Sequence, residues 1–225
     1  MAGPILYTAE VDYPAEHHAP HGKWNDWYAH RHAPDLFKLG ARSVASYRPV
    51  TGGLAVLNLY EMPDSAVFKT PAYIGMTPKD PYAPETRELS AGKKRAQTLY
   101  LERSVLPADR AAIDADWLSV LRFAAPEPED EAILDWLRGD AQKQLAPFGL
   151  KHLRYGTRLP ETVGAGSFRP RCAIFTEWPA QPPDSADLLP ALARRFGAKV
   201  GEAESFLGWR AYPWADAKPK QAPSV

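Results

Sequence analysis

Apolar and polar positions along this chain change their spacing several times, and each change predicts a new element of secondary structure. Alternating or continuous apolar runs predict strands at residues 5–13, 41–50, 53–62 and 96–106. A helical spacing of apolar residues starts near Pro20 and ends at Gly40, a residue type that commonly terminates helices. A second, less regular helical segment is expected after the third strand. The first half therefore has the order βαββαβ.

The second half of the chain repeats this order. Strands are predicted at residues 117–125, 150–159, 171–178 and 205–214. A helix begins near Pro126 or Pro128, with acidic residues in its first turn, and ends at Gly149. The stretches NDWYAHRHAPDLFKLG and LDWLRGDAQKQLAPFG align without a gap, and LNLYEMPDS matches AIFTEWPAQPPDS with a small insertion. Two matches in the same order indicate a duplicated unit.

Duplication predicts the fold class, which is α+β. A four-stranded sheet covered by helices on one face leaves its other face apolar, and a twin sheet can bury that face. We therefore expect two ferredoxin-like βαββαβ units whose antiparallel sheets face each other and pack into an intramolecular α/β barrel. The first, site-bearing unit is placed at residues 1–110. The second unit, with a degenerate site, is placed at residues 111–214, and a loose tail follows at 215–225.

Composition narrows the class of protein. The 225 residues include 27 basic and 27 acidic side chains, so the formal net charge is zero and nucleic acid is not an expected partner. No apolar stretch approaches the ~20 residues that span a bilayer, and the N-terminus lacks the basic leader of a signal peptide. The single cysteine, Cys172, excludes an intramolecular disulfide. We expect a soluble, cytoplasmic protein with no membrane partner.

The first helix carries polar groups on its apolar face. At about 100° per residue, one stripe collects the apolar and aromatic side chains Trp24, Trp27, Tyr28, Leu36 and Leu39. Arg31, His32 and Asp35 project within the same stripe, whereas His30 points away. Either the polar groups form a site, or His32 is a core histidine with its hydrogen bonds satisfied.

The repeat provides an internal control for that choice. The second helix keeps the packing positions but has apolar or neutral residues where the first has Tyr28, His32 and Asp35: Leu137, Ala141 and Gln144. The third strands differ in the same way, since Asn58 and Tyr60 correspond to Ile174 and Thr176. Glu61 and Glu177, on the opposite strand face, match each other and indicate a structural role. Polar character in one copy favours a single functional site on a duplicated scaffold.

Prolines complicate two segments of the first half. Pro34 predicts that the first helix kinks or restarts just after His32. Residues 68–82 contain three prolines before Tyr82 and are too broken for a long helix. This segment is either a lid that carries Tyr73 and Tyr82 over a pocket or an ordinary irregular connection.

The stretch NDWYAHRHAPDL, followed by GLAVLNLYEM and FKTPAY, resembles the dimeric α/β-barrel superfamily, and most closely its EthD-type members. The resemblance covers the first half well, whereas the second half shares the layout but lacks the histidine and tyrosine. It implies that His32 matches the family's helix histidine and that Trp27 and Tyr28 match its aromatic pair. Arg31 replaces the family's usual glutamate, so Asp35 is the carboxylate left to pair with the histidine. Relatives with this fold include cyclases, lactone isomerases, dehalogenases, quinol-forming monooxygenases and haem-degrading enzymes.

These residues suit proton-transfer chemistry. His32 is the expected acid/base, oriented by Asp35, while Asn58 and Tyr60 stabilise developing negative charge. Substrate-binding roles are expected for the aromatic and basic neighbours Trp24, Tyr28, Arg31 and Tyr73. We therefore expect a cofactor-independent lyase, isomerase or cyclase that acts on an aromatic or cyclic apolar small molecule. The alternatives are a non-catalytic binding or accessory protein and a haem- or quinol-type monooxygenase.

Other kinds of site are less favoured by the sequence. Five histidines between residues 17 and 32 invite a metal site, but Pro20 and Gly22 interrupt them and His30 and His32 face different sides of the helix. No metal or cofactor is expected, although an apolar pocket with one histidine leaves haem open. Cys172 lies in an apolar strand with no evident histidine partner. Whether two copies pair as a homodimer also stays open.

Overall fold

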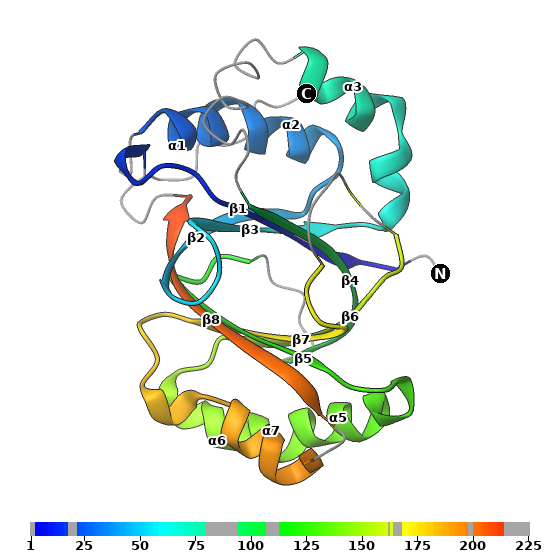
Figure 1. Ribbon diagram of the computed structural model, residues 1–225, viewed down its shortest axis with the longest axis vertical. Coiled ribbons are helices and arrows are strands. Elements are labelled where there is room, and N and C mark those ends of the chain that lie inside the picture. The colour runs from blue at the N-terminus through cyan, green and yellow to red at the C-terminus, as the bar shows by residue number, and fades with distance from the viewer. Residues whose placement is uncertain are drawn as a thin grey trace.

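The computed structural model describes residues 3–17, 22–79, 94–106, 113–161, 163, 168–197 and 200–213. Within them the chain forms one closed antiparallel barrel in the strand order β1-β3-β2-β8-β5-β7-β6-β4. Figure 1 shows this barrel between two helical layers, with α1, α2 and α3 on one side and α5, α6 and α7 on the other. The predicted α+β class and the intramolecular α/β barrel are confirmed. The expected tail at 215–225 and the predicted boundary near residue 110 lie outside the described residues.

The first half contributes β1 to β4 and the helices of one layer. Its elements in chain order are β1 (Ile5–Val11), a 3-10 turn (Ala15–His17), α1 (Lys23–Trp27), a π-helical turn (Tyr28–His32), α2 (Ala33–Lys38), β2 (Ser43–Thr51), β3 (Val56–Met62), a 3-10 turn (Ser65–Lys69), α3 (Pro71–Lys79) and β4 (Arg95–Leu106). Residues 68–82 were expected to be too broken for a long helix, and α3 within them is short, with nine residues. Pro71 occupies its first turn, where a missing N–H is tolerated, and the Thr70 hydroxyl accepts a hydrogen bond from the Tyr73 N–H.

The second half repeats these elements and supplies the other layer. They are β5 (Trp117–Ala124), a 3-10 turn (Glu127–Glu129), α5 (Asp130–Trp136), a π-helical turn (Leu137–Ala141), α6 (Gln142–Leu145), a 3-10 turn (Ala146–Phe148), β6 (His152–Arg158), β7 (Cys172–Trp178), a 3-10 turn (Asp184–Ala186), α7 (Leu189–Phe196) and β8 (Gly201–Tyr212). The Gly149 predicted to end the helix does so with a φ of +77°. The division into units 1–110 and 111–214 stays a prediction.

Hydrogen bonds join the two sheets at both of their edges. Strand β2 pairs with β8 and β4 pairs with β6, so both junctions between the halves are hydrogen-bonded. An open sheet would leave the backbone groups of its edge strands unpaired, and closure satisfies them. The two sheets of the expected intramolecular barrel are therefore joined edge to edge by hydrogen bonds as well as facing each other.

Side chains alternate between the barrel interior and the helix-covered outer face. On β1, Ile5 and Tyr7 pack beneath the first helical layer, while Leu6 joins the apolar interior with Tyr47 and Phe206. The interior also holds buried charges. Glu10 pairs with Arg122 at 2.8 Å, and both side chains are almost fully buried.

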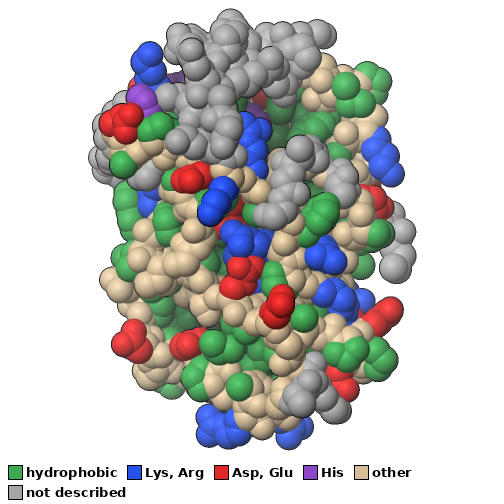
Figure 2. Space-filling model, viewed as in Figure 1, with side chains coloured by type: hydrophobic (Ala, Val, Ile, Leu, Met, Phe, Trp, Pro, Cys, Tyr) green, Lys and Arg blue, Asp and Glu red, His purple; other side chains and the backbone are tan. Residues whose placement is uncertain are grey.

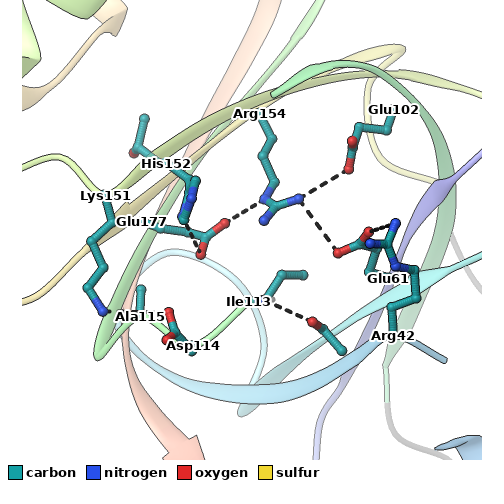
Figure 3. A network of polar contacts seen from close by, with 12 residues as sticks. Arg42, Glu61, Glu102, Ile113, Asp114, Ala115, Lys151, His152, Arg154 and Glu177 are labelled. Atoms are coloured by element: carbon teal, nitrogen blue, oxygen red, sulfur yellow. Dashed lines mark hydrogen bonds and ion pairs between the residues drawn. The ribbon is translucent and has the colours of Figure 1, made fainter. Parts of the chain in front are cut away.

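A second set of charges, the Arg154 network, lies elsewhere in the interior (Figure 3). Arg154 bonds to Glu177 at 2.6 Å and to Glu102 at 3.3 Å, and it lies 3.7 Å from Glu61. The predicted structural role of the matched pair Glu61 and Glu177 is consistent with this burial. Figure 2 shows acidic and basic side chains intermingled over the middle of one outer face, in keeping with the zero net charge.

Candidate functional site

The π-helical turn sets the direction of the candidate site residues. It spans Tyr28–His32, and the N–H of Ala33 returns to the Tyr28 carbonyl before α2 starts with Pro34 in its first turn. The backbone keeps right-handed helical angles through His32 and Ala33, so the predicted kink or restart at Pro34 takes the form of a widened turn within a continuous helix. The second half has a π-helical turn at the equivalent residues, Leu137–Ala141. The turn thus belongs to the duplicated scaffold, and only the side chains it presents distinguish the two halves.

The imidazole of His32 packs within a group of aromatic rings. It stacks on Trp27, with ring centroids 4.7 Å apart and planes inclined by 25°. Tyr28 and Tyr60 lie at 5.5 Å and 6.4 Å, measured between ring centroids. His32 is half-buried, whereas His30 is exposed. The predicted opposite orientations of these two histidines are therefore observed.

Buried tyrosines form the floor beneath His32. Tyr60 of β3 lies beside Tyr7 of β1, with ring centroids 5.1 Å apart, and Tyr28 lies 6.5 Å from Tyr60. Gln97 donates a 2.6 Å hydrogen bond to the Tyr7 hydroxyl. Burial raises the pKa of the Tyr60 hydroxyl well above its ordinary value, so this group keeps its proton and can act as a hydrogen-bond donor.

Two half-buried rings border this floor, and sequence analysis missed one of them. Tyr212 of β8 meets Tyr28 edge-on at 5.3 Å, so the second half of the chain contributes to the cluster. Tyr73 of α3 packs edge-on against Phe68 at 4.9 Å, which brings the expected binding residue to the cluster. Tyr82 lies outside the described residues, so the lid hypothesis stays untested. We call Tyr7, Trp27, Tyr28, His32, Tyr60, Phe68, Tyr73 and Tyr212 the aromatic cluster.

Asn58 lies next to the aromatic cluster on the same face of β3 as Tyr60. Its carbonyl oxygen accepts a 2.5 Å hydrogen bond from the Ser46 hydroxyl, and its amide donates a 3.0 Å bond to the Ala9 carbonyl. Both ends of the amide are thus engaged within the sheet. Ser46 also favours ionisation of the Tyr28 hydroxyl, although burial dominates and raises the pKa of Tyr28 overall. The geometry suits a positioning role for Asn58.

Asp35 and Arg31 lie at a cavity between α2 and α3. Asp35 pairs with Arg31 at 3.4 Å and with Lys38 at 3.0 Å, so both carboxylate oxygens face cations. These three side chains border a cavity of about 310 Å³ whose opposite wall comes from α3. Orientation of His32 by Asp35 and substrate binding by Arg31 stay predictions, since the ion pairs observed for Asp35 are those with Arg31 and Lys38.

Trp24 packs apart from the aromatic cluster. It is buried and stacks on Tyr13, with ring centroids 4.9 Å apart and planes inclined by 18°. The guanidinium of Arg48 covers the same tyrosine at 4.8 Å. Trp24 approaches the cluster only through Trp27, at 5.2 Å. Its surroundings are those of a packing residue, and its expected contact with substrate stays a prediction.

The buried tyrosines predict a loss of stability in alkaline solution. Burial raises the pKa of Tyr73 to about 12 and also raises the pKa values of Tyr7 and Tyr60. Above pH ~10, tyrosines of the unfolded chain release their protons while these hydroxyls keep theirs. The folded state then binds more protons, so the free energy of unfolding falls as pH rises. Arg48 has the opposite effect, because burial lowers its pKa to about 10 and the unfolded chain then holds that proton more tightly than the folded one. It is one group against several tyrosines.

Urea denaturation between about pH 8 and pH 11 measures this dependence. We expect the midpoint to fall steadily above pH ~10, and to fall less steeply in Tyr73→Phe, which lacks one ionisable ring. A midpoint that stays constant across this range would contradict the assignment.

The described residues do not bring metal ligands together. Among residues 3–79, excluding 18–21, and the described parts of 94–213, no group of three His, Cys, Asp or Glu side chains could hold a metal ion. His18 and His21 lie outside the described residues. In the same described part of the chain, no helix is both long and apolar enough to cross a membrane.

Comparisons with known proteins identify the fold. No family model matches the sequence, and no curated protein does. A structure of an anthrone oxidase-like protein is 18% identical, with a TM-score of 0.56 over 97% of each chain. A monooxygenase-type protein from Lactobacillus acidophilus is 11% identical, with a TM-score of 0.56 over 93% of this chain and 94% of that chain. A heme-binding protein from Thermus thermophilus is 10% identical, with a TM-score of 0.55 over 93% of this chain and 92% of that chain.

At these identities the likeness establishes a shared fold and nothing about activity. The predicted dimeric α/β-barrel fold is confirmed, whereas the narrower EthD-type resemblance is not shown.

One of these structural neighbours binds heme, so the residues that line the cavities of this chain are compared with the ligands that haem requires. Haem iron takes an axial histidine, cysteine, methionine or tyrosine. A cavity of about 260 Å³ lies over the outer face of β5, β7 and β8, and none of these residue types lines it. Met76 is the one such residue lining the cavity beside α2, and a thioether accompanies a histidine where it ligates haem. The residues bordering these two cavities therefore do not fit an axially ligated haem.

Proposed function

We propose that this protein is a cofactor-independent enzyme that oxidises an aromatic C–H acid with dioxygen, and that His32 is its base. The observation that carries the proposal is the half-buried imidazole of His32, stacked on Trp27 above the hydroxyl-bearing rings of Tyr28 and Tyr60. A neutral imidazole accepts protons near neutral pH. The equivalent positions of the second half, Leu137 and Ala141, offer no titratable group.

The substrate class follows from the walls around His32. The accessible rings of Trp27, Tyr73 and Tyr212 present flat apolar surfaces, which suit a flat aromatic molecule. The anthrone oxidase-like structural neighbour suggests an anthrone as the first candidate. The CH2 group of an anthrone is acidic because removal of one proton converts the central ring into an aromatic phenolate.

The reaction needs a base and dioxygen. Neutral His32 takes one proton from the CH2 carbon, the carbanion forms a C–O bond with O2, and His32 returns the proton to the outer oxygen to give a hydroperoxide. Loss of the second C–H proton with cleavage of the O–O bond then releases water and leaves the carbonyl. Overall, CH2 + O2 becomes C=O + H2O: the carbon loses four electrons, one oxygen atom enters the carbonyl, and the other leaves as water with both hydrogens. A positioned base contributes roughly 10²–10⁴ in rate.

Tyr60 and Asn58 support the same step in this proposal. The hydroxyl of Tyr60 keeps its proton because burial raises its pKa, so it can donate to the oxygen on which negative charge develops. Asn58 acts as a positioning residue by holding Ser46 beneath Tyr28.

The same base without oxygen would serve a lyase, isomerase or cyclase, as the sequence predicted. Incubation of the purified protein with anthrone in air and under nitrogen separates these classes. We expect anthraquinone to form only in air, with one O2 consumed per product. Product formed equally under nitrogen would replace oxidation by an oxygen-independent reaction. Saturable binding of anthrone without any turnover would identify a binding protein and contradict the proposal.

A further inference from the structure

The 260 Å³ cavity in the second half corresponds to the floor of the aromatic cluster in the first. Strand pairing fixes the correspondence, since Tyr7 lies opposite Tyr60 between β1 and β3, and Ser119 lies opposite Thr176 between β5 and β7. Both Ser119 and Thr176 line the cavity. The first half therefore fills this place with two tyrosines, and the second half leaves it open.

The segment that follows the third strand of each half covers this place, and it too carries a smaller side chain in the second half. In the first half the ring of Phe68 packs edge-on against Tyr7 at 5.0 Å. The matching sequence PDSAVF and PDSADL puts Leu188 at the corresponding position of the second half, where it lines the cavity. The positions equivalent to Tyr7, Tyr60 and Phe68 therefore carry no aromatic ring, although Phe206 also lines the cavity. The second half keeps the same backbone arrangement but has smaller side chains at these positions, which leaves the space open. Protein cores are normally packed without voids of this size, so the cavity is a specific feature of the second half.

The polar groups of the cavity define what it can bind. Trp178 donates a 3.2 Å hydrogen bond from its indole nitrogen to the Ser119 hydroxyl oxygen, which leaves the hydroxyl hydrogen to donate to a ligand. The exposed carboxylates of Asp184 and Asp187 stand at the rim, and no lysine, arginine or histidine lines the cavity. A ligand with a hydrogen-bond acceptor suits Ser119, and an anion is disfavoured by the rim.

We propose that this cavity is a second binding site, distinct from the His32 site, for a neutral one-ring aromatic molecule that carries a carbonyl. The apolar walls from Leu121, Ile174 and Leu207 contact the ring, and Ser119 donates to the carbonyl. A dry apolar cavity of roughly 150 Å³ accommodates benzene, so a volume of about 260 Å³ accommodates a substituted ring. This site does not depend on the oxidation proposed above.

Titration of acetophenone into the full-length protein tests this binding site. The readout is the NMR signal of the Trp178 indole N–H. The Trp178→Phe variant, which lacks this signal, assigns it. We expect a saturable shift of this signal. Thr176→Tyr installs the first half's Tyr60 in the cavity and should weaken binding at least tenfold. Ser185→Ala, at an exposed residue that does not line the cavity, is the matched control and should bind as the wild type does. His32→Ala should also bind acetophenone unchanged, which separates this site from the proposed catalytic one.

An anionic ligand and a second filled variant complete the experiment. Benzoate, the anionic analogue, should bind at least tenfold more weakly than acetophenone because of the rim carboxylates. If Thr176→Tyr does not fold, Ser119→Tyr, which mimics Tyr7, takes its place. Undiminished binding to the filled variant overturns the proposal. A Trp178 signal that does not move with acetophenone, or equal binding of benzoate, also overturns it.

Discussion

Replacing His32 with alanine is expected to lower the turnover of an anthrone by roughly 10²–10⁴-fold, the usual cost of losing a positioned general base. The loss should fall mainly on kcat, since Trp27, Tyr73 and Tyr212 remain to hold the aromatic substrate. Steady-state kinetics with O2 consumption as the readout measure this loss.

The chain offers a matched control two residues away. His30 is exposed on the same π-helical turn, so His30→Ala should leave turnover close to that of the wild type. A urea denaturation curve for each variant shows whether the fold is retained, since His32 also packs on Trp27. Equal and small effects of the two substitutions would reject the assignment of His32 as the base.

The orientation of His32 could be predicted because it depends on local features. Helical periodicity placed it on the apolar face. The π-helical turn that carries it recurs in the second half at Leu137–Ala141 without a proline beside it, so Pro34 alone did not indicate that turn. The repeat supplied the rest, since it exposed the polar differences between the two helices and fixed the order of the strands. Periodicity and duplication are properties of the sequence itself, so they need no knowledge of tertiary contacts.

The rest of the site depends on contacts between distant segments. Tyr7 alternates onto the same strand face as Ile5, so its direction was accessible from sequence, but its pairing with Tyr60 needs the strand register. Tyr212 comes from the last strand of the second half, and it reaches Tyr28 because β8 pairs with β2. Closure of the barrel also depends on that pairing. The cavity beside Arg31 and Asp35 also needs a distant segment, because its other wall comes from α3.

The interior of the barrel shows what duplication required of the sequence. Glu61 and Glu177 occupy equivalent positions on β3 and β7, so closure brings two buried carboxylates into one interior. Arg154 bonds to Glu177 and lies near Glu61, and it occupies the position that corresponds to Ala45 in the first half (Figure 3). One arginine of the second half thus compensates carboxylates from both halves. Neither half, taken alone, would indicate the need for it.

Replacing Arg154 with methionine is therefore expected to destabilise the protein by about 3–5 kcal/mol, the cost of leaving a buried charge without its partner. Burial lowers the pKa of Arg154, but Glu177, Glu102 and Glu61 outweigh it and hold the pKa above its ordinary value. Urea denaturation at neutral pH measures the loss. The double variant Arg154→Met/Glu177→Leu removes a charge from each side of the shortest pair and should recover part of the stability. An Arg154→Met protein as stable as the wild type would show that the carboxylates do not depend on this arginine. A double variant that loses the sum of both single effects would show the same, because independent sites add and coupled sites do not.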